Sequence, residues 1–146
     1  ACGPKERMPK ADLVATCREL ARESGGSVTL TSSVEEACTG ADVVYTDIWV
    51  SMGEPAELWE ERIKLLSPYQ VNNRVIDLMA PTGIFMHCLP AFHDTETTIG
   101  AEIAERFGIT EMEVTDEVFR GSRSRVFDEA ENRMHSIKAI IYATLK

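Results

Sequence analysis

The sequence predicts an α/β fold of three layers, in which helices cover both faces of a parallel sheet. Segments with the composition of strands alternate along the chain with segments of helical periodicity. No Asn-Gly or Asp-Gly pair, the signal of a tight β-hairpin, separates them. The run at residues 42–48 is β-branched and aromatic without polar alternation, which is typical of a strand covered on both faces.

The first part of the chain predicts two helices and two strands. Apolar residues at helical spacing indicate a helix over residues 11–24, which Gly25 and Gly26 end. Residues 28–31 have the composition of a short strand. The Ser-x-x-Glu pattern at residues 33–36 is a capping box that opens a short helix before the strand at 42–48.

The middle of the chain predicts two helical pieces and a strand. A helix over residues 56–66 is interrupted at Ser67 and Pro68, and a second helical piece follows. A turn then leads into a strand at residues 84–88, which Pro90 stops. The second helical piece has an apolar face formed by Val71, Val75, Leu78 and Met79.

The last part of the chain predicts a helix, a short strand and a long final helix. The first of these helices precedes Gly108, and residues 112–114 form the strand. Asp128 is the expected cap of the final helix, and Glu131, Asn132 and Arg133 then fall in its first turn. The stripe expected to be buried on this helix comprises Ala130, Met134, Ile137, Ile141 and Leu145.

Composition limits the classes of function. The chain has 146 residues, enough for one domain with a sizeable core, and its net charge is −9, which disfavours nucleic acid as a partner. No apolar run approaches the ~20 residues of a membrane helix, so we expect a soluble, cytoplasmic protein without membrane contact. The four cysteines form no C-x-x-C pair, and the abrupt start indicates a fragment of a longer chain.

Polar side chains follow two of the predicted strands. Parallel strands joined by right-handed crossovers end at the same sheet edge, where open α/β sheets bind ligands. Asp47 follows one strand, and His87 and Cys88 lie at the end of another. The carboxylate after so apolar a strand either caps a turn or receives a cationic ligand.

Several interpretations of the segment IFMHCLPAFHD remain open on residues alone. A zinc site is disfavoured because His87 and Cys88 are adjacent on a strand and point to opposite faces. A nucleophilic Cys88 activated by His93 or His135 is weakly supported. The simplest alternative is that Cys88 is a small buried hydrophobe and His87 a satisfied polar group. We predict no metal site and no cofactor.

Two further segments carry residues suited to a ligand. Ser51 offers a hydroxyl, and Gly53 permits close approach of the backbone, although a plain loop would also explain them. A cation early in a helix is unfavourable for the helix dipole, so an anion or carbonyl group held near Arg133 would explain that residue. A salt bridge to Glu129 or Glu131 would explain it equally.

Five segments, in this order, resemble the second half of the ornithine carbamoyltransferase family, most closely its catabolic-type bacterial branch: YTDIWVSMGE, PYQVN, FMHCLPAFHD, MEVTDEVF and VFDEAENRMHSIKA. The resemblance implies an incomplete, Rossmann-like ornithine-binding domain over residues 1–146. The carbamoyl phosphate domain and the first strand-helix unit have no counterpart in the sequence. In that family the last helix, here residues 129–146, packs across to the other domain.

The resemblance also implies roles for individual residues. Asp47, Ser51 and Met52 match residues that bind L-ornithine, with Asp47 near the side-chain amine. Cys88 matches a thiol that contacts this amine, and Cys88, Leu89 and Arg133 match residues on the carbamoyl phosphate side. Asp47, Cys88 and Arg133 are thus the expected catalytic residues. His87 belongs to the HCLP motif without an assigned role, and we expect Cys88 to face Asp47 across the space that an amine occupies.

The implied function is transfer of a carbamoyl group from carbamoyl phosphate to L-ornithine, giving L-citrulline and phosphate in arginine metabolism, by a homo-oligomer (homotrimers or their multiples in the family). We expect no activity from these 146 residues alone. A putrescine or another amine or amino-acid carbamoyltransferase, or a non-catalytic binding fragment, remains an alternative. An aspartate enzyme would need cationic groups in place of SMG and HCLP.

Overall fold

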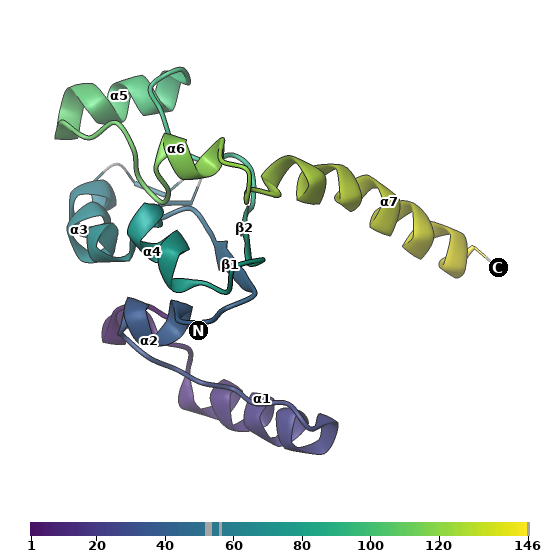
Figure 1. Ribbon diagram of the computed structural model, residues 1–146. Coiled ribbons are helices and arrows are strands. Elements are labelled where there is room, and N and C mark those ends of the chain that lie inside the picture. Colours follow the sequence, from purple (N-terminus) through teal and green to yellow (C-terminus); the bar gives the residue numbers. More distant parts are fainter. Residues whose placement is uncertain (52–53, 56, 146) are drawn as a thin grey trace.

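The computed structural model describes residues 1–51, 54–55 and 57–145. It has a small parallel sheet with helices around it (Figure 1). The strands are β1 (Val43–Thr46) and β2 (Ile84–His87). The α-helices are α1 (Ala11–Ser24), α2 (Val34–Cys38), α3 (Leu58–Leu66), α4 (Asn73–Leu78), α5 (Thr98–Phe107), α6 (Asp116–Phe119) and α7 (Val126–Thr144), and Lys5–Arg7 and Ser67–Tyr69 are short 3-10 helices.

The sheet places the ends of its two strands at one edge. β1 and β2 are parallel, and their register pairs Val43 with Ile84 and Thr46 with His87. The residues that follow the strands, Asp47 and Cys88, therefore leave the sheet side by side. This confirms the predicted parallel α/β arrangement, which contains α-helical crossovers instead of hairpins.

Two of the predicted strands are wrong as regular strands. In the segment 28–31 only Thr31 pairs, in a parallel bridge to Cys2, and in the segment 112–114 only Val114 pairs, in a parallel bridge to Val71. A strand requires successive paired residues, and each of these segments has a partner for a single position. Their parallel direction nevertheless agrees with the predicted sheet.

Local signals located most helix ends. The helix at Ala11–Ser24 has the predicted bounds, and Gly25 ends it with φ 76°, a left-handed conformation that glycine adopts freely. The Ser33 side chain accepts a hydrogen bond from the Glu36 N–H, as the capping box predicts. The Glu36 carboxylate, however, accepts from Thr31 Oγ1 at 2.5 Å, so the box closes through a neighbouring residue.

Two apolar clusters form the core. The larger one joins β2 with α2, α4 and α6 and centres on Phe85, whose exposed fraction is 0%. The second fills the space beside the loops that follow the strands. It comprises Trp49, Val50, Phe92, Ile103 and Met112, with Trp59, Ile63 and Leu66 of α3 packed against it. The segments that follow β1 and β2 are therefore both packed into this second cluster.

One face of β1 is open in this structure. Val43 and Tyr45 are 49% and 53% exposed, whereas Val44 and Thr46 are partly buried. The prediction that this strand is covered on both faces is therefore wrong for the residues described. The side chains of β1 are packed against neighbours on only one face of the strand.

The last helix projects away from the body of the molecule (Figure 1). It begins at Val126, and Asp128 does not cap it, because Val126 is buried and the Arg125 N–H donates to the Phe85 carbonyl of β2 at 2.9 Å. The stripe expected to be buried is exposed, with Met134 at 62% and Ile141 at 52%. Nothing within the described chain covers this side of the helix.

No helix within residues 1–51, 54–55 and 57–145 combines the length and the apolar character needed to cross a membrane.

Candidate functional site

Asp47 and Cys88 meet at the carboxyl ends of the two strands. The Cys88 thiol donates a hydrogen bond to Asp47 Oδ1 at 2.9 Å, and the same oxygen accepts from the Ile48 N–H at 2.8 Å. The parallel register brings the two residues together, as the sequence predicted. The expected gap between them is absent, since thiol and carboxylate are in direct contact.

Burial and nearby negative charge both act on the Cys88 thiol. Burial, then the hydrogen bond and charge of Asp47, raises the pKa of Cys88 to about 11, with Glu129 adding to the shift. The thiol is therefore protonated near neutral pH. Among the residues that the structure describes, neither Asp47 nor Glu129 forms an ion pair, so the acidic site has no cation of its own.

Tyr45 connects the strand to the final helix beside this site. Its hydroxyl donates to Glu129 Oε1 at 2.7 Å. That hydrogen bond, followed by burial and the charge of Glu129, raises the pKa of Tyr45 to about 12. The second carboxylate oxygen of Glu129 is buried without a hydrogen-bond partner in the described part of the chain. The Glu129 carboxylate thus lies near the start of α7, where its charge raises the pKa of both Cys88 and Tyr45.

His87 lies behind the site and not in it. Its exposed fraction is 0%, and its Nδ1 is 2.6 Å from Thr46 Oγ1, its partner in the register. Burial lowers the pKa of His87, which keeps the imidazole neutral. His87 and Cys88 therefore have different partners, Thr46 and Asp47, and the geometry assigns His87 to the pairing of the strands.

Ser51 and Leu89, also expected to bind substrate, lie in the segments that follow β1 and β2. Ser51 is exposed, and its N–H donates to Glu54 Oε2 at 2.7 Å, while Glu54 pairs with Arg62 at 3.1 Å. Leu89 is 45% exposed and joined to Pro90 by a cis peptide bond. Met52 and Gly53 lie outside the described residues.

Arg133 does not join this group. It is exposed on α7, and its side chain makes no hydrogen bond or ion pair within the described chain. Because the helix begins at Val126, Arg133 lies well past the first turn, and the electrostatic argument based on a first-turn position is wrong. The structure brings Asp47 and Cys88 together and leaves Arg133 apart.

Glu113 is a site-supporting residue that the sequence reasoning missed. Its exposed fraction is 0%, and its carboxylate accepts from the Trp49 N–H at 3.2 Å and from the Phe92 N–H at 3.1 Å. The signal available in the sequence was a single acid between Met112 and Val114, because a carboxylate in an apolar run must find partners when it is buried.

A second polar cluster joins the loop after β2 to the start of α6. His93, Asp94 and Asp116 offer ligand atoms within 4.8 Å of one another, the geometry of a possible metal site. Arg120 already pairs with Asp116 at 2.7 Å and Asp94 at 3.0 Å, and the His93 ring stacks on Phe119. The cluster is therefore satisfied as an ion-pair network and includes neither His87 nor Cys88.

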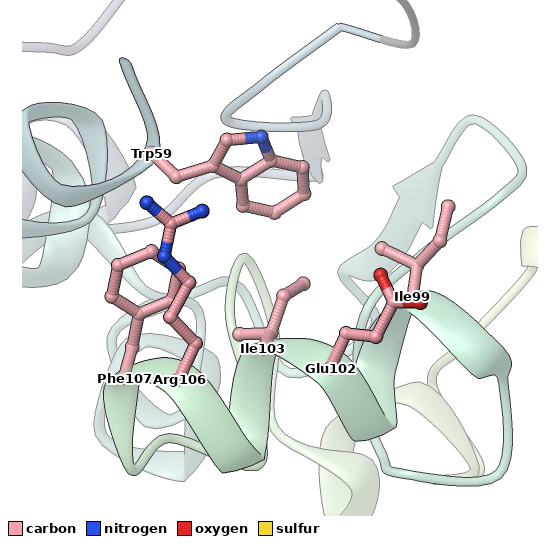
Figure 2. A pocket seen from close by; sticks show the side chains of 6 residues that line it. All are labelled: Trp59, Ile99, Glu102, Ile103, Arg106 and Phe107. Atoms are coloured by element: carbon pink, nitrogen blue, oxygen red, sulfur yellow. The ribbon is translucent and has the colours of Figure 1, made fainter. Parts of the chain in front are cut away.

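An apolar surface pocket lies away from Asp47 and Cys88. Side chains of α5 and of α3 form it, and Figure 2 shows Trp59 above the guanidinium of Arg106, with Ile103 between Arg106 and Glu102 on α5. Asp47 and Cys88 do not line it. It extends the second core cluster to the surface and contributes no polar group to the strand ends.

Two known proteins match nearly the whole chain in sequence. The catabolic ornithine carbamoyltransferase of Treponema denticola is 61% identical over 145 residues, 99% of this chain and 43% of that protein. The ornithine carbamoyltransferase of Staphylococcus aureus (strain Newman) is 54% identical over 143 residues, 97% of this chain and 43% of that protein. The chain thus spans less than half the length of these relatives.

A solved structure shows the same fold. Ornithine carbamoyltransferase from Pyrococcus furiosus superposes with a TM-score of 0.75 and 38% identity, over 94% of this chain and 38% of that one. The family model for the Asp/Orn-binding domain of aspartate/ornithine carbamoyltransferase matches residues 1–144. The chain therefore belongs to the aspartate/ornithine carbamoyltransferase family and corresponds to its Asp/Orn-binding domain.

Proposed function

We propose that the chain is the ornithine-binding part of an ornithine carbamoyltransferase, which transfers the carbamoyl group of carbamoyl phosphate to the side-chain amine of L-ornithine. The observation that carries this proposal is the contact of Asp47 with Cys88 in an acidic site where, among the described residues, neither Asp47 nor Glu129 has an ion-pair partner. An alkylammonium group would supply the missing positive charge. Citrulline and phosphate are then the products.

In this proposal the ammonium group of ornithine occupies the position where the Cys88 thiol proton lies in the free site. An ammonium group donates to Asp47 in place of Cys88 and rests against the Cys88 sulfur. Asp47 recruits and orients the amine, because a carboxylate stabilises the charged form. Carbamoyl transfer needs the neutral amine, and with a reference pKa of ~10.4 its deprotonation at neutral pH requires about 4 kcal/mol.

Cys88 is a poor base for that proton. Its pKa of about 11 means that the free site presents a thiol, so we assign Cys88 to contact with the amine and the carbamoyl group. The phosphate of the carbamoyl donor is the base we propose. Arg133, with Leu89, is assigned to the carbamoyl side, where a guanidinium stabilises the oxygen charge that develops during attack. Ser51 and Met52 are assigned to the amino-acid substrate.

The acidic site also selects among substrates. Aspartate would bring a second carboxylate toward Asp47 and Glu129, which repel it. Putrescine carries a suitable amine and is the second candidate. Rates with ornithine, putrescine and aspartate, measured on the full-length protein, distinguish the three, and we expect ornithine to be preferred.

Replacing Asp47 tests the proposal. In the full-length protein, Asp47→Asn should lower kcat/KM for ornithine by about 30-fold or more, the effect of about 2 kcal/mol when a charged hydrogen-bond partner is lost. The dissociation constant of carbamoyl phosphate should stay within about twofold, since Asp47 does not face that substrate. Unchanged ornithine kinetics would contradict the assignment.

Asp42→Asn is the matched control. Asp42 is exposed and precedes the same strand at its opposite end, so the variant removes an equal charge without reaching the site. Its ornithine kinetics should equal those of the unaltered protein. Equal losses in both variants would indicate a general electrostatic effect and not a contact with substrate.

We further infer that the residues 129–146 pack on another part of the full-length protein, that the protein is a homo-oligomer, and that it acts in the cytoplasm. The exposed Met134 and Ile141 support the first inference, because apolar side chains at helical spacing normally have a partner. The chain alone should form no citrulline, and detectable product from the 146 residues would contradict this.

A further inference from the structure

One carboxylate, that of Glu113, holds both loops of the proposed site and is not among the residues expected to contact substrate. Glu113 Oε1 accepts from the Trp49 N–H, and Glu113 Oε2 accepts from the Phe92 N–H, at 3.2 and 3.1 Å. Trp49 follows Asp47 in the loop after β1, and Phe92 follows Cys88 in the loop after β2. One side chain therefore bridges the two segments that carry the site.

The backbone around Glu113 is fixed from both sides. The Val71 N–H donates to the Glu113 carbonyl at 2.9 Å, and the Met112 N–H donates to the Phe92 carbonyl at 2.7 Å. Met112 and Val114 are almost completely buried, with exposed fractions of 1% and 0%. Glu113 thus extends from a buried segment that backbone hydrogen bonds hold to Val71 and to Phe92.

The bridge matters most when substrate is bound. The contact of Cys88 with Asp47 also joins the loops, but the proposed amine replaces that contact. Among the side-chain hydrogen bonds of the described residues, the pair made by Glu113 then remains to limit the separation of the loops. Burial raises the pKa of Glu113, while the two N–H donors act in the opposite direction.

We propose that Glu113 is a positioning residue for carbamoyl transfer, holding the loops after β1 and β2 so that Asp47 and Cys88 keep the spacing that the amine requires. The proposal rests on the proposed function. It assigns to Glu113 no contact with substrate. Its effect passes through the Trp49 and Phe92 amides.

Two variants of the full-length protein test the bridge. In Glu113→Gln the amide oxygen can accept from one N–H, while the NH₂ group faces the other donor, so one hydrogen bond is lost. Glu113→Asp keeps the charge but is one methylene shorter and cannot reach both donors. Each should lower kcat/KM for ornithine about 10- to 100-fold, the effect of a misplacement near 1 Å, with most of the loss in kcat.

Glu111→Gln is the control. Glu111 belongs to the same segment, and its Oε1 accepts the Asp116 N–H at 2.7 Å, so the chemical change is identical but neither site loop is touched. Ornithine kinetics should stay within about twofold of the unaltered protein. If Glu113→Gln does not fold, Glu113→Asp carries the test.

Amide hydrogen exchange supplies a readout independent of turnover. Exchange at Trp49 and Phe92 should accelerate in both Glu113 variants and remain slow in Glu111→Gln. Wild-type kinetics in a folded Glu113 variant, or unchanged exchange at both amides, would overturn the proposal. If the unaltered protein failed to carbamoylate ornithine, the proposed function would fall, while the exchange experiment would still decide whether Glu113 bridges the loops.

Discussion

Replacing Asp47 by Asn should make the Cys88 thiol more reactive toward alkylating agents. Burial and Asp47 together raise the pKa of Cys88 from its ordinary value of 9.0 to about 11. Burial is the largest cause and persists in the variant. The hydrogen bond to the carboxylate and its charge are the next two causes. Asp47→Asn removes the charge and leaves a neutral carbonyl oxygen, which is a weaker hydrogen-bond acceptor.

The magnitude follows from the fraction of thiolate, which is the reactive form. At pH 8 a thiol with a pKa of 11 is about 0.1% ionised, whereas one with a pKa of 9.0 is about 10% ionised. Asp47→Asn should recover part of this difference. We expect Cys88 to react about tenfold faster at pH 8, with about 100-fold as the upper limit.

The assay is the rate of iodoacetamide labelling of the Cys88 peptide, followed by mass spectrometry between pH 7 and 10. Cys17, on α1, reports the reactivity of a thiol outside the site in the same samples. Asp42→Asn provides the charge control. An equal Cys88 rate in Asp47→Asn and unaltered protein would refute the argument that the carboxylate holds the proton on sulfur.

Three further changes test the core, the buried imidazole and the exposed helix. Phe85→Ala should lower the free energy of unfolding by about 3–5 kcal/mol in urea titrations, because Phe85 is fully buried; the exposed Phe127→Ala should have a much smaller effect. Burial lowers the pKa of His87 below its ordinary value of 6.5. As the pH falls below about 6.5, the imidazole is therefore protonated in the unfolded chain before it is protonated in the folded chain. The free energy of unfolding should therefore fall between pH 7 and 5, and His87→Gln should flatten that slope; an equal slope would contradict the neutral imidazole. Exposed α7 side chains should promote self-association, which the double substitution Ile137→Glu and Ile141→Glu should weaken in sedimentation experiments.

Residues whose role follows from strand direction could be predicted from the sequence. Asp47 and Cys88 each follow an apolar strand, and a parallel arrangement brings such positions to one edge. Helix ends marked by Gly25 and Ser33 were predictable for a similar reason, since each signal acts within a few residues. Local chemistry and chain direction thus located much of the fold and the centre of the site.

Features that depend on distant partners could not be predicted in the same way. The bridge made by Glu113 depends on two loops that are far from it in sequence, and the neutral state of His87 depends on its burial in the folded chain. Periodicity marked Ile141 as a buried position, but periodicity does not reveal whether the covering surface belongs to the same segment of chain. Arg133 is likewise exposed and has no ion-pair partner among the described residues.

The register of the two strands also determines where this protein tolerates changes in length. Thr46 pairs with His87, and the residue after each strand enters the site. One residue inserted within either strand would reverse the faces of the side chains beyond it. It would bring His87 to the position that Cys88 occupies, or Thr46 to the position that Asp47 occupies. An insertion at the exposed turn residues Pro81 and Thr82 leaves this pairing intact. The turn before β2 can therefore be lengthened without changing the pairing of the strands. The length of the four-residue strands, in contrast, determines which residues reach the site.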